Sequence, residues 1–328
     1  MTAQTDSMDR AYQSFLKASP EYESTRLLDD LRVSDYGRLD RLGQVFLDYT
    51  GGGLYADSQI RKIAELLDGG IFGNPHSDSP ASSATTVLVE ETWDSVLRYF
   101  NAPPDEYVAI FTANATGAIK LVGEAYPFHA GDRYLLSFDN HNSINGVREF
   151  ARAQGADVTY VRVVPPDLRL DEAQLRMELD RPHEGGNNLF SCPSQSNFSG
   201  VQHPMEWTSY AHERGWDVLL DCAAFAPSNR LDLAEALPDF VPLSFYKMFD
   251  YPTGVGCLLA RKTALAKLVR PWFAGGTITI ASVQAERHFL ADGEQAFEEG
   301  TLNYLNIPAA GIELKHIESI GIDTIHNR

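Results

Sequence analysis

Two residues that could do chemistry follow apolar runs in the second half of the chain. Asp221 ends the run WDVLLD, and Lys247 follows FVPLSFY, between the aromatic residues Tyr246 and Phe249. An apolar setting disfavours a charged ammonium and favours the neutral amine, which can attack a carbonyl carbon. A carboxylate in such a place is partly buried and needs a cationic or hydrogen-bonding partner. We therefore expect both side chains to serve one site.

Three more apolar runs are followed by polar residues. The segment TANATGAIKLV (112–122) places small and hydroxyl residues at the start of a predicted helix, which could bind a phosphate or simply cap the helix. His141 follows RYLLSF and is either catalytic or an ordinary polar residue at a strand end. Gln195 and Asn197 follow NLFSCPS, at a position where amides commonly cap turns.

The elements that must position these residues alternate between helix and strand from about residue 85 onward. Segments with helical periodicity, such as TTVLVEETWDSVLRYF and SINGVREFARAQG, separate short apolar runs. The runs of strand length are YVAIFTA, RYLLSF, DVTYVRVV, NLFSCPS, DVLLDCAAF, FVPLSFY and VGCLLAR. This alternation predicts an α/β fold with a mostly parallel, seven-stranded sheet flanked by helices. Ligands bind at the carboxyl ends of parallel strands, where all these polar residues fall.

The first part of the chain has a different pattern. Residues 1–45 are polar with scattered apolar positions, which predicts one or two peripheral helices. The segment QVFLDYTGGGLYAD (44–57) predicts a short strand and a glycine-rich turn, and SQIRKIAELLDGG (58–70) predicts a helix that ends at glycine.

Composition excludes several classes of function. The formal net charge of −18 makes nucleic acid and anionic membranes poor partners. The N-terminus lacks a basic segment followed by an apolar one, and no run of about eighteen apolar residues occurs, so we expect a cytoplasmic protein. Cys192, Cys222 and Cys257 lie in apolar runs without a CxxC pair, which favours buried core residues over nucleophiles or a disulfide framework. We expect no metal site.

An aspartate and then a lysine, each at a strand end, with a candidate phosphate site upstream, fit one cofactor. Pyridoxal 5'-phosphate needs a lysine for a Schiff base, a carboxylate for its pyridinium nitrogen and an anion site. Spacing alone does not separate this cofactor from coincidence.

Longer blocks of sequence carry a resemblance to a known family. In order, the blocks are FLDYTGGGLY, FGNPHSDSPAS, FTANATGAIKLVGEAYPF, DNHNSINGVREFA, PSQSNFSGVQHP, VLLDCAAFAP, SFYKMFDYPTGVGCLLAR, WFAGGTI and FEEGTLNYLNIPA. They resemble class V aminotransferases and cysteine desulfurases, which are fold type I pyridoxal-phosphate enzymes. They are most similar to the N-terminal domain of molybdenum cofactor sulfurases, from about residue 44 to the end of the chain.

The resemblance implies roles for the residues at the strand ends. Lys247 resembles the Schiff-base lysine that also moves the α-proton of the substrate. Asp221 would keep the pyridinium nitrogen protonated, and His141 would stack on the cofactor ring. Asn197, together with Gln195, falls where the family contacts the oxygen on the ring.

The resemblance also implies a phosphate site and an assembly. Ala115 and Thr116 would donate a backbone N–H and a hydroxyl to the phosphate, joined by Ser244 and Tyr246. Thr301 resembles a threonine that reaches the phosphate of the neighbouring subunit, which implies a homodimer with shared active sites.

Some positions depart from the pattern of cysteine desulfurases. Ala224 stands where they have a glutamine that contacts the phenolic oxygen, and Tyr246 stands where they have a histidine. Asp250 replaces a glycine that is common in the sulfurase branch. Beside GTLNY the chain offers Glu298 and Glu299 in place of an arginine for the substrate carboxylate.

The resemblance divides the chain into three parts. Residues 1–45 would form a peripheral helical segment, 46–300 the large cofactor-binding domain and 301–328 the start of a small domain. Too little sequence follows Thr301 for a whole small domain, so we expect that domain, with the persulfide cysteine of desulfurases, to be largely missing.

Three functions follow as hypotheses. The first is a pyridoxal-phosphate enzyme that acts on an amino acid through a Lys247 Schiff base, most similar to a cysteine desulfurase or sulfurtransferase with L-cysteine as its substrate. The second is an aminotransferase or lyase on another amino acid. The third is a truncated, non-catalytic dimerisation module.

Overall fold

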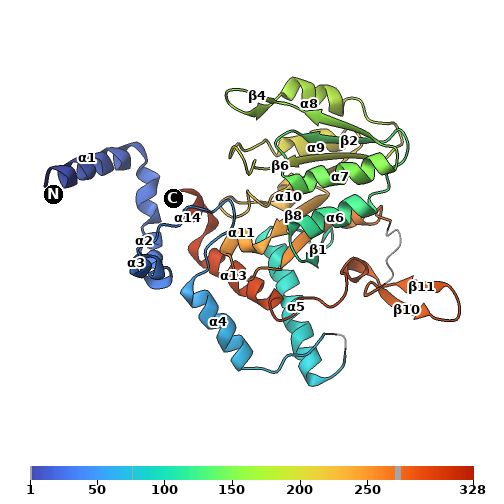
Figure 1. The fold of residues 1–328 in the computed structure, drawn as a ribbon, viewed down its shortest axis with the longest axis horizontal. Helices are drawn as coiled ribbons and strands as arrows, with labels where there is room; N and C mark the ends of the chain where they lie inside the picture. Colours follow the sequence, from blue (N-terminus) through green and yellow to red (C-terminus); the bar gives the residue numbers. More distant parts are fainter. Residues whose placement is uncertain (1, 76, 270–274) are drawn as a thin grey trace.

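A seven-stranded sheet forms the centre of the protein (Figure 1). The computed structural model describes residues 2–75, 77–269 and 275–328. Along the sheet the strands are β1 (Tyr107–Thr112), β9 (Gly256–Arg261), β8 (Phe240–Ser244), β7 (Trp216–Asp221), β6 (Asn188–Pro193), β2 (Arg133–Ser137) and β3 (Asp157–Val161). Within this sheet only β9 runs antiparallel to its neighbours. The predicted mostly parallel α/β sheet is therefore confirmed.

Helices cover both faces of the sheet and bury two hydrophobic cores. One face packs against α6 (Ala115–Ala125) and α7 (Asn142–Ala153), and the other mainly against α5 (Pro80–Tyr99), α8 (Glu172–Leu179), α9 (Glu206–His212) and α13 (Ile307–Ile320). Neighbouring residues on one strand enter opposite cores: Leu219 packs with the α6 and α7 side, whereas Val218 and Leu220 pack with the other. Since side chains of a strand alternate between faces, an apolar run marks a strand buried on both sides.

The predicted strand within residues 44–57 is wrong. This segment contains no strand, and it crosses the turn that carries Lys247. The backbone N–H of Gly53 donates to the carbonyl of Tyr246 at 2.8 Å. A Cβ at Gly53 would lie 2.9 Å from the nitrogen of Phe249. The TGGG motif therefore allows two backbones to approach closely. The pattern of residue types along this segment predicted a strand and a turn because it contains no information about that contact.

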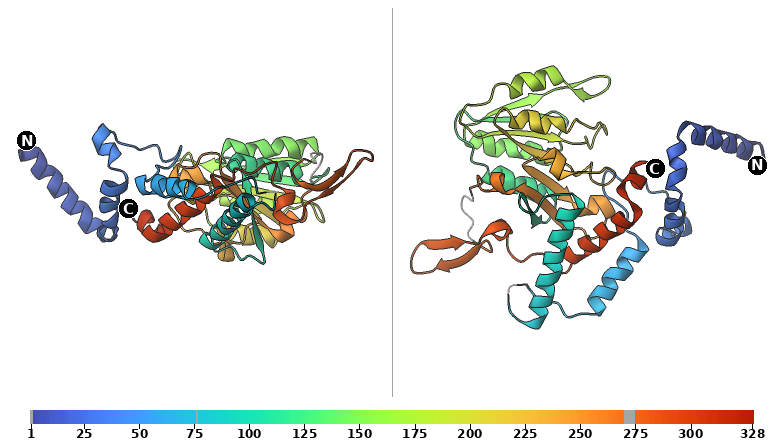
Figure 2. Two further views of the ribbon diagram at one scale, coloured as in Figure 1. Left: turned by 90° about the horizontal axis from the view of Figure 1, so that it is seen from below. Right: turned by 180° about the vertical axis from the view of Figure 1, so that it is seen from behind.

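The N-terminal segment is helical and carries more elements than expected. It contains α1 (Thr2–Ala18), a 3-10 helix η1 (Pro20–Thr25), α2 (Leu27–Asp35) and α3 (Arg38–Leu42). In both views of Figure 2, α1 extends away from the sheet. Asp35 anchors α2 to the predicted helix α4 (Asp57–Asp68), because its carboxylate accepts from the N–H of Ser58 at 2.7 Å. Arg38 adds an ion pair of 2.9 Å to Asp57.

Two hairpins were not expected. The predicted strand DVTYVRVV is split: β3 ends at Val161, and β4 (Val163–Val164) pairs with β5 (Arg169–Leu170). A second hairpin, β10 (Ile278–Ser282) and β11 (Arg287–Leu290), projects from the body (Figure 1). Residues 272–274 of the WFAGGTI block and residue 76 of FGNPHSDSPAS lie outside the described residues.

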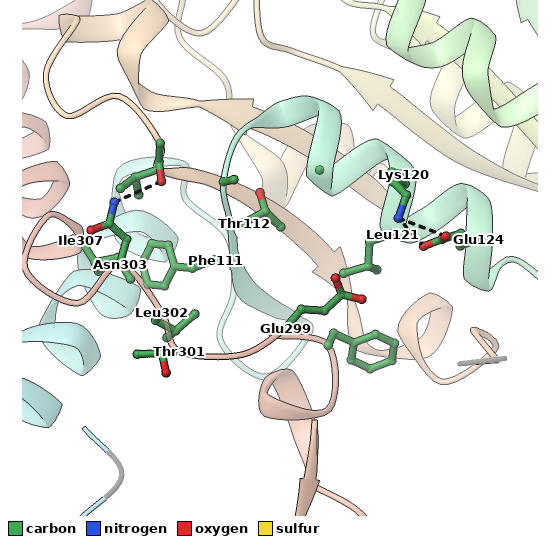
Figure 3. A pocket seen from close by; sticks show the side chains of 15 residues that line it. Phe111, Thr112, Lys120, Leu121, Glu124, Glu299, Thr301, Leu302, Asn303 and Ile307 are labelled. Carbon is green, nitrogen blue, oxygen red and sulfur yellow. Dashed lines mark hydrogen bonds and ion pairs between the residues drawn. The ribbon is translucent and has the colours of Figure 1, made fainter. Parts of the chain in front are cut away.

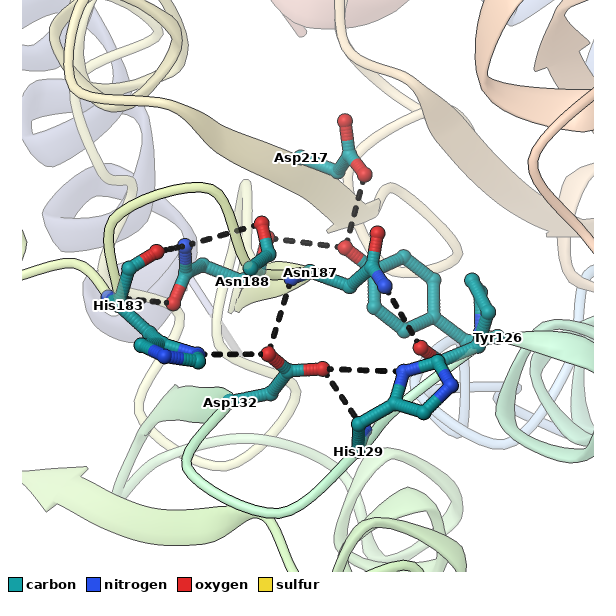
Figure 4. Close-up of polar contacts among 9 residues, drawn as sticks. Tyr126, His129, Asp132, His183, Asn187, Asn188 and Asp217 are labelled. Atoms are coloured by element: carbon teal, nitrogen blue, oxygen red, sulfur yellow. Dashed lines mark hydrogen bonds and ion pairs between the residues drawn. The ribbon is translucent and has the colours of Figure 1, made fainter.

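A polar network closes the amino-terminal ends of β2 and β6 (Figure 4). Asp132 is buried there and accepts from the backbone N–H groups of His129 at 2.7 Å and Asn187 at 3.1 Å, while His183 Nδ1 lies 2.9 Å away. Nearby, the hydroxyl of Tyr126 donates to Asp217 at 2.8 Å. These bonds hold the loops at the edge of the sheet opposite to the polar strand ends.

The last segment packs onto the rest of the chain. Helix α13 buries Ala310 and Leu314, and a Cβ at Gly311 would lie 3.1 Å from Thr92 Oγ1 on α5. A short helix, α14 (Ile322–His326), follows it. The domain boundaries at 45/46 and 300/301 stay predictions. In the described ranges, no helix combines the length and the apolar composition that crossing a membrane requires.

Candidate active site

Lys247 lies on the helical turn that follows the central strand β8. This turn is α11 (Phe245–Phe249), where Phe245 and Phe249 are buried and stack with their ring centroids 5.9 Å apart. Residues four apart share one face of a helix, so these two rings anchor α11 in the core. The side chain of Lys247 is half-buried and lines a small cavity.

That cavity gathers residues from the ends of four parallel strands. Its walls are His141, Pro193, Gln195, Asn197, Asp221, Ala223, Ala224 and Lys247. Pro193 and Asp221 are the last residues of β6 and β7, and the others follow β2, β6, β7 and β8. The strand-end rule explains the convergence, because the carboxyl ends of parallel strands share one edge of the sheet.

Asp221 is the buried carboxylate of this cavity. Burial raises the pKa of Asp221 above its ordinary value, while the hydrogen bond from the N–H of Ala223 and the nearby Lys247 and His141 act in the opposite direction. The Ala223 N–H donates to Oδ1 at 3.0 Å, and the other oxygen has no hydrogen-bond partner among the described residues. A carboxylate oxygen that has no protein partner and belongs to a residue lining the cavity fits a cationic N–H such as a protonated pyridine nitrogen.

The start of helix α6 lies beside the turn of Lys247. Asn114 caps this helix, since its Oδ1 accepts from the N–H of Gly117 at 2.9 Å. Ser244 Oγ accepts from the N–H of Ala115 at 2.8 Å. A Cβ at Gly256 would lie 2.5 Å from the Cα of Asn114, so only glycine lets β9 approach the cap. The first turn of α6 is thus held next to Ser244, in an arrangement suited to an anion.

Ser143, which the sequence did not single out, links this turn to the histidine. Thr116 Oγ1 lies 2.7 Å from Ser143 Oγ, and Ser143 Oγ lies 3.0 Å from His141 Nδ1. The N–H of Ser143 also donates to His141 Nδ1 at 3.2 Å. Two bonds to one ring nitrogen fix the orientation of the imidazole at the start of α7.

The amide of Gln195 is held by two further residues that sequence reasoning missed. Gln195 Oε1 accepts from Gln202 Nε2 and from Asn229 Nδ2, each at 3.2 Å. These bonds occupy the oxygen, so the NH2 group is the end that can serve a ligand. Asn197 lies in the following turn, which Ser196 stabilises through bonds from two backbone N–H groups. An isolated bridge pairs Gln195 with Gln202, and Asn229 bonds to the amides of both.

Five predicted cofactor residues do not line the cavity. Ala115, Thr116 and Ser244 lie beside it, at the start of α6 and the end of β8, and the other two are Tyr246 and Thr301. Tyr246 points to the glycine loop, where a Cβ at Gly52 would lie 3.4 Å from its ring. Thr301 is exposed and lines a separate pocket with Thr112, Lys120 and Glu299 (Figure 3). A role for Thr301 at a neighbouring subunit stays a prediction.

The three cysteines are buried in the core. Burial raises the pKa of the thiols of Cys192, Cys222 and Cys257, so each is held as the weakly nucleophilic thiol. Within the described residues, no cluster of His, Cys, Asp and Glu could hold a metal ion.

A lysine, a buried aspartate and a capped helix start lie together at the carboxyl edge of a mostly parallel sheet, so the chain is an α/β protein with a candidate active site at its strand ends. The chain belongs to the aminotransferase class-V family, whose model matches residues 45–328.

Comparison with known proteins adds relatives and structural neighbours. The molybdenum cofactor sulfurase of Arabidopsis thaliana is 35% identical over 94% of this chain and 42% of its own length. The chain therefore spans less than half of that relative. A cysteine desulfurase from Thermococcus onnurineus NA1 has a similar fold, with a TM-score of 0.78 and 24% identity over 90% of this chain and 72% of that one. A mutant of C-DES with glycine covalently linked to its PLP cofactor has a TM-score of 0.69 and 21% identity over 83% of this chain and 71% of that one.

Proposed function

We propose that this chain is a pyridoxal-phosphate enzyme that acts on an amino acid, with L-cysteine as the substrate. The observation that carries the proposal is the convergence of Lys247, Asp221 and His141 on one small cavity. Family membership and neighbours such as C-DES with its PLP-linked ligand support pyridoxal phosphate as the cofactor. The names of the sulfurase and desulfurase relatives support cysteine.

Each residue of the cavity would do a specific task. Pyridoxal phosphate, when bound, supplies an electron sink that stabilises negative charge on the substrate carbon. Lys247 Nζ would hold the cofactor covalently and, once released, take the proton from the α-carbon of the substrate. The free oxygen of Asp221 would accept a hydrogen bond from the ring nitrogen and keep that nitrogen protonated. The imidazole of His141, oriented by Ser143, would cover one face of the ring.

The remaining polar groups would orient the ends of the cofactor. Ser244, Thr116 and the first turn of α6 would bind the phosphate. The N–H of Ala115 donates to Ser244 Oγ in this structure, so it would join the phosphate site only by exchanging that bond. Gln195 and Asn197 would donate to the oxygen on the ring, which the side chain of Ala224 cannot do because it has no polar atom. Tyr246 would join the phosphate site only after its side chain moves away from Gly52.

The burial of all three cysteines favours a second candidate. A desulfurase that stores sulfur as a persulfide needs an accessible thiolate, and the thiols of this chain are inaccessible. A lyase that releases the sulfur of its substrate needs no such thiol. One similar structure is a cystine C-S lyase, C-DES, in complex with its product cysteine persulfide.

The proposal extends to assembly and location. We infer a homodimer in the cytoplasm, in which Thr301 contributes to the active site of the partner. A monomer at all concentrations in light scattering would contradict the shared site.

Reconstitution with pyridoxal phosphate tests the proposal. The wild-type protein should become yellow, and Lys247→Ala should lose the covalently held, visible absorbance, whereas the surface variant Lys262→Ala should keep it. A wild-type protein that stays colourless would refute the cofactor assignment. Trapping with radiolabelled cysteine then separates the two candidates, because only a sulfurtransferase leaves label on the protein.

A further inference from the structure

A large chamber adjoins the cavity and opens onto Lys247. It has a volume of about 790 Å³, within the range of roughly 300–1,000 Å³ that small-molecule pockets occupy. Helix α2, the loop after β6 and the helices α13 and α14 form its walls. Residues from each wall and from the lysine turn are Leu31, Tyr36, Phe198, Lys247, Ile317 and Ile325. The chamber is therefore mostly apolar, and Lys247 forms part of its wall.

The charge on the chamber walls is opposite to that of the whole chain. Arg32, Lys247 and Arg328 line it, and no aspartate or glutamate does so in the described parts of the chain. The chain as a whole carries 45 Asp and Glu against 27 Lys and Arg. His316 also lines the chamber, and burial lowers its pKa, so it adds no charge at neutral pH. A mostly apolar chamber whose charged lining residues are all basic complements an anion with an apolar body.

The two arginines differ in how firmly they are held. Arg328 donates to Thr25 at 3.2 Å, bonds Asp29 and lies 4.3 Å from the ring centroid of Tyr22. Arg32 has one ion pair, with Asp40 at 2.7 Å, in which the side chains are 45% and 64% exposed. Exposed pairs contribute little free energy, so an anion inside the chamber can compete with Asp40 for this guanidinium.

We propose that the chamber binds a small anionic molecule, whose anionic group pairs with Arg32 and whose apolar part packs against α2 and α13. The anion could be the carboxylate of the amino-acid substrate, in which case the inference rests on the proposed function. It could also belong to a separate carboxylate ligand that occupies the space beside Lys247. The shared chemistry is a carboxylate recognised by a guanidinium.

Calorimetric titration of the purified protein with phenylbutyrate, and with the uncharged phenylbutanol, tests the site. Phenylbutyrate should bind, and Arg32→Gln should weaken its binding by about tenfold or more, because a charge-assisted hydrogen bond is lost. Binding of phenylbutanol should not change between the variants. The matched control is Arg26→Gln on the same helical segment, since Arg26 pairs with Glu23 and is outside the chamber. Equal binding of the acid and the alcohol, or unchanged binding of the acid to Arg32→Gln, would overturn the proposal.

Kinetics with the loaded enzyme then distinguishes the two sources of the anion. If the substrate supplies the carboxylate, Arg32→Gln should raise KM for L-cysteine but not for cysteamine, which lacks the carboxylate, and phenylbutyrate should compete with cysteine. If a separate ligand supplies it, KM should stay unchanged and the inhibition by phenylbutyrate should not be competitive. A protein that binds phenylbutyrate through Arg32 but not pyridoxal phosphate would refute the proposed function and leave the anion site intact.

Discussion

Ser244 Oγ accepts a hydrogen bond of 2.8 Å from the backbone N–H of Ala115. This bond joins the end of β8, three residues before Lys247, to the first turn of α6. It holds the candidate phosphate site and the candidate covalent anchor at a defined separation. The sequence of either segment alone does not reveal this contact, since the two partners are 129 positions apart in the chain.

Replacement of Ser244 tests whether this junction binds the phosphate. Ser244→Ala removes one hydroxyl from the site, and we expect the Kd for pyridoxal phosphate to rise roughly three- to tenfold, as is typical for one hydrogen bond. Titration followed by visible absorbance measures the change. Ser209→Ala on the surface of α9, where the hydroxyl donates to the carbonyl of Glu206 within the same helix, serves as the control. Equal affinity in both variants would place the phosphate elsewhere.

Replacement of Gly53 tests the close approach of the glycine loop to the lysine turn. A methyl group at this position would lie 2.9 Å from the nitrogen of Phe249 and 3.0 Å from that of Asp250, and backbone atoms cannot easily move aside. Gly53→Ala should lower the free energy of unfolding by about 1–3 kcal/mol, as overpacking does, and should also weaken cofactor binding. Chemical denaturation measures the first effect. Gly146→Ala on α7, where an added Cβ would meet nothing within 4 Å apart from its chain neighbours and its own helix, should instead be neutral or stabilising. Equal losses in both variants would show that the close approach at Gly53 is not the cause.

Replacement of Asp250 tests whether the backbone at the end of α11 is strained. It has φ +64° and ψ −59°, and the N–H of Tyr251 donates to the carbonyl of Phe249 at 2.8 Å across it. This is the γ-turn geometry that is strained for residues with a side chain. Asp250→Gly should raise the free energy of unfolding by about 1 kcal/mol, after the entropy cost of glycine is subtracted. Asp250→Ala is the informative comparison: a gain of the same size would assign the effect to the charge and not to the backbone.

Two buried glutamates should make the free energy of unfolding depend on pH. Burial raises the pKa of Glu298 and of Glu313 from 4.5 to about 8. Because the folded pKa lies above the unfolded one, the protonated form is favoured by folding. The contribution to stability is complete below about pH 4.5 and is lost as the pH rises to about 8.

Thermal unfolding between those limits checks this prediction. Glu298→Gln keeps an oxygen that can accept from the N–H of Phe111, which Glu298 accepts at 2.9 Å, but cannot ionise. Between about pH 4.5 and 8, we expect the unfolding temperature of Glu298→Gln to rise relative to that of the wild type as the pH increases. Glu106→Gln, at an exposed position, should follow the wild type. Parallel pH profiles of Glu298→Gln and the wild type would show that Glu298 does not titrate there.

The sequence by itself determined the sheet and the residues at its carboxyl edge. Apolar runs of strand length are local features, and the geometry of parallel strands brings their ends together, so Lys247, Asp221, His141 and the amides of Gln195 and Asn197 could be predicted to meet. The local sequence pattern predicted a strand within 44–57 because it contains no information on the contact between Gly53 and the turn that carries Lys247.

Only the tertiary structure decided which partners complete the site. The bond between Ala115 and Ser244, the link from Thr116 through Ser143 to His141 and the chamber that Arg32 and Lys247 both line all involve residues from separate elements. It also placed Thr301 in a different pocket from Lys247. Periodicity and motif spacing describe neighbours along the chain, whereas hydrogen bonds and cavities depend on distances in space that arise only when the elements pack.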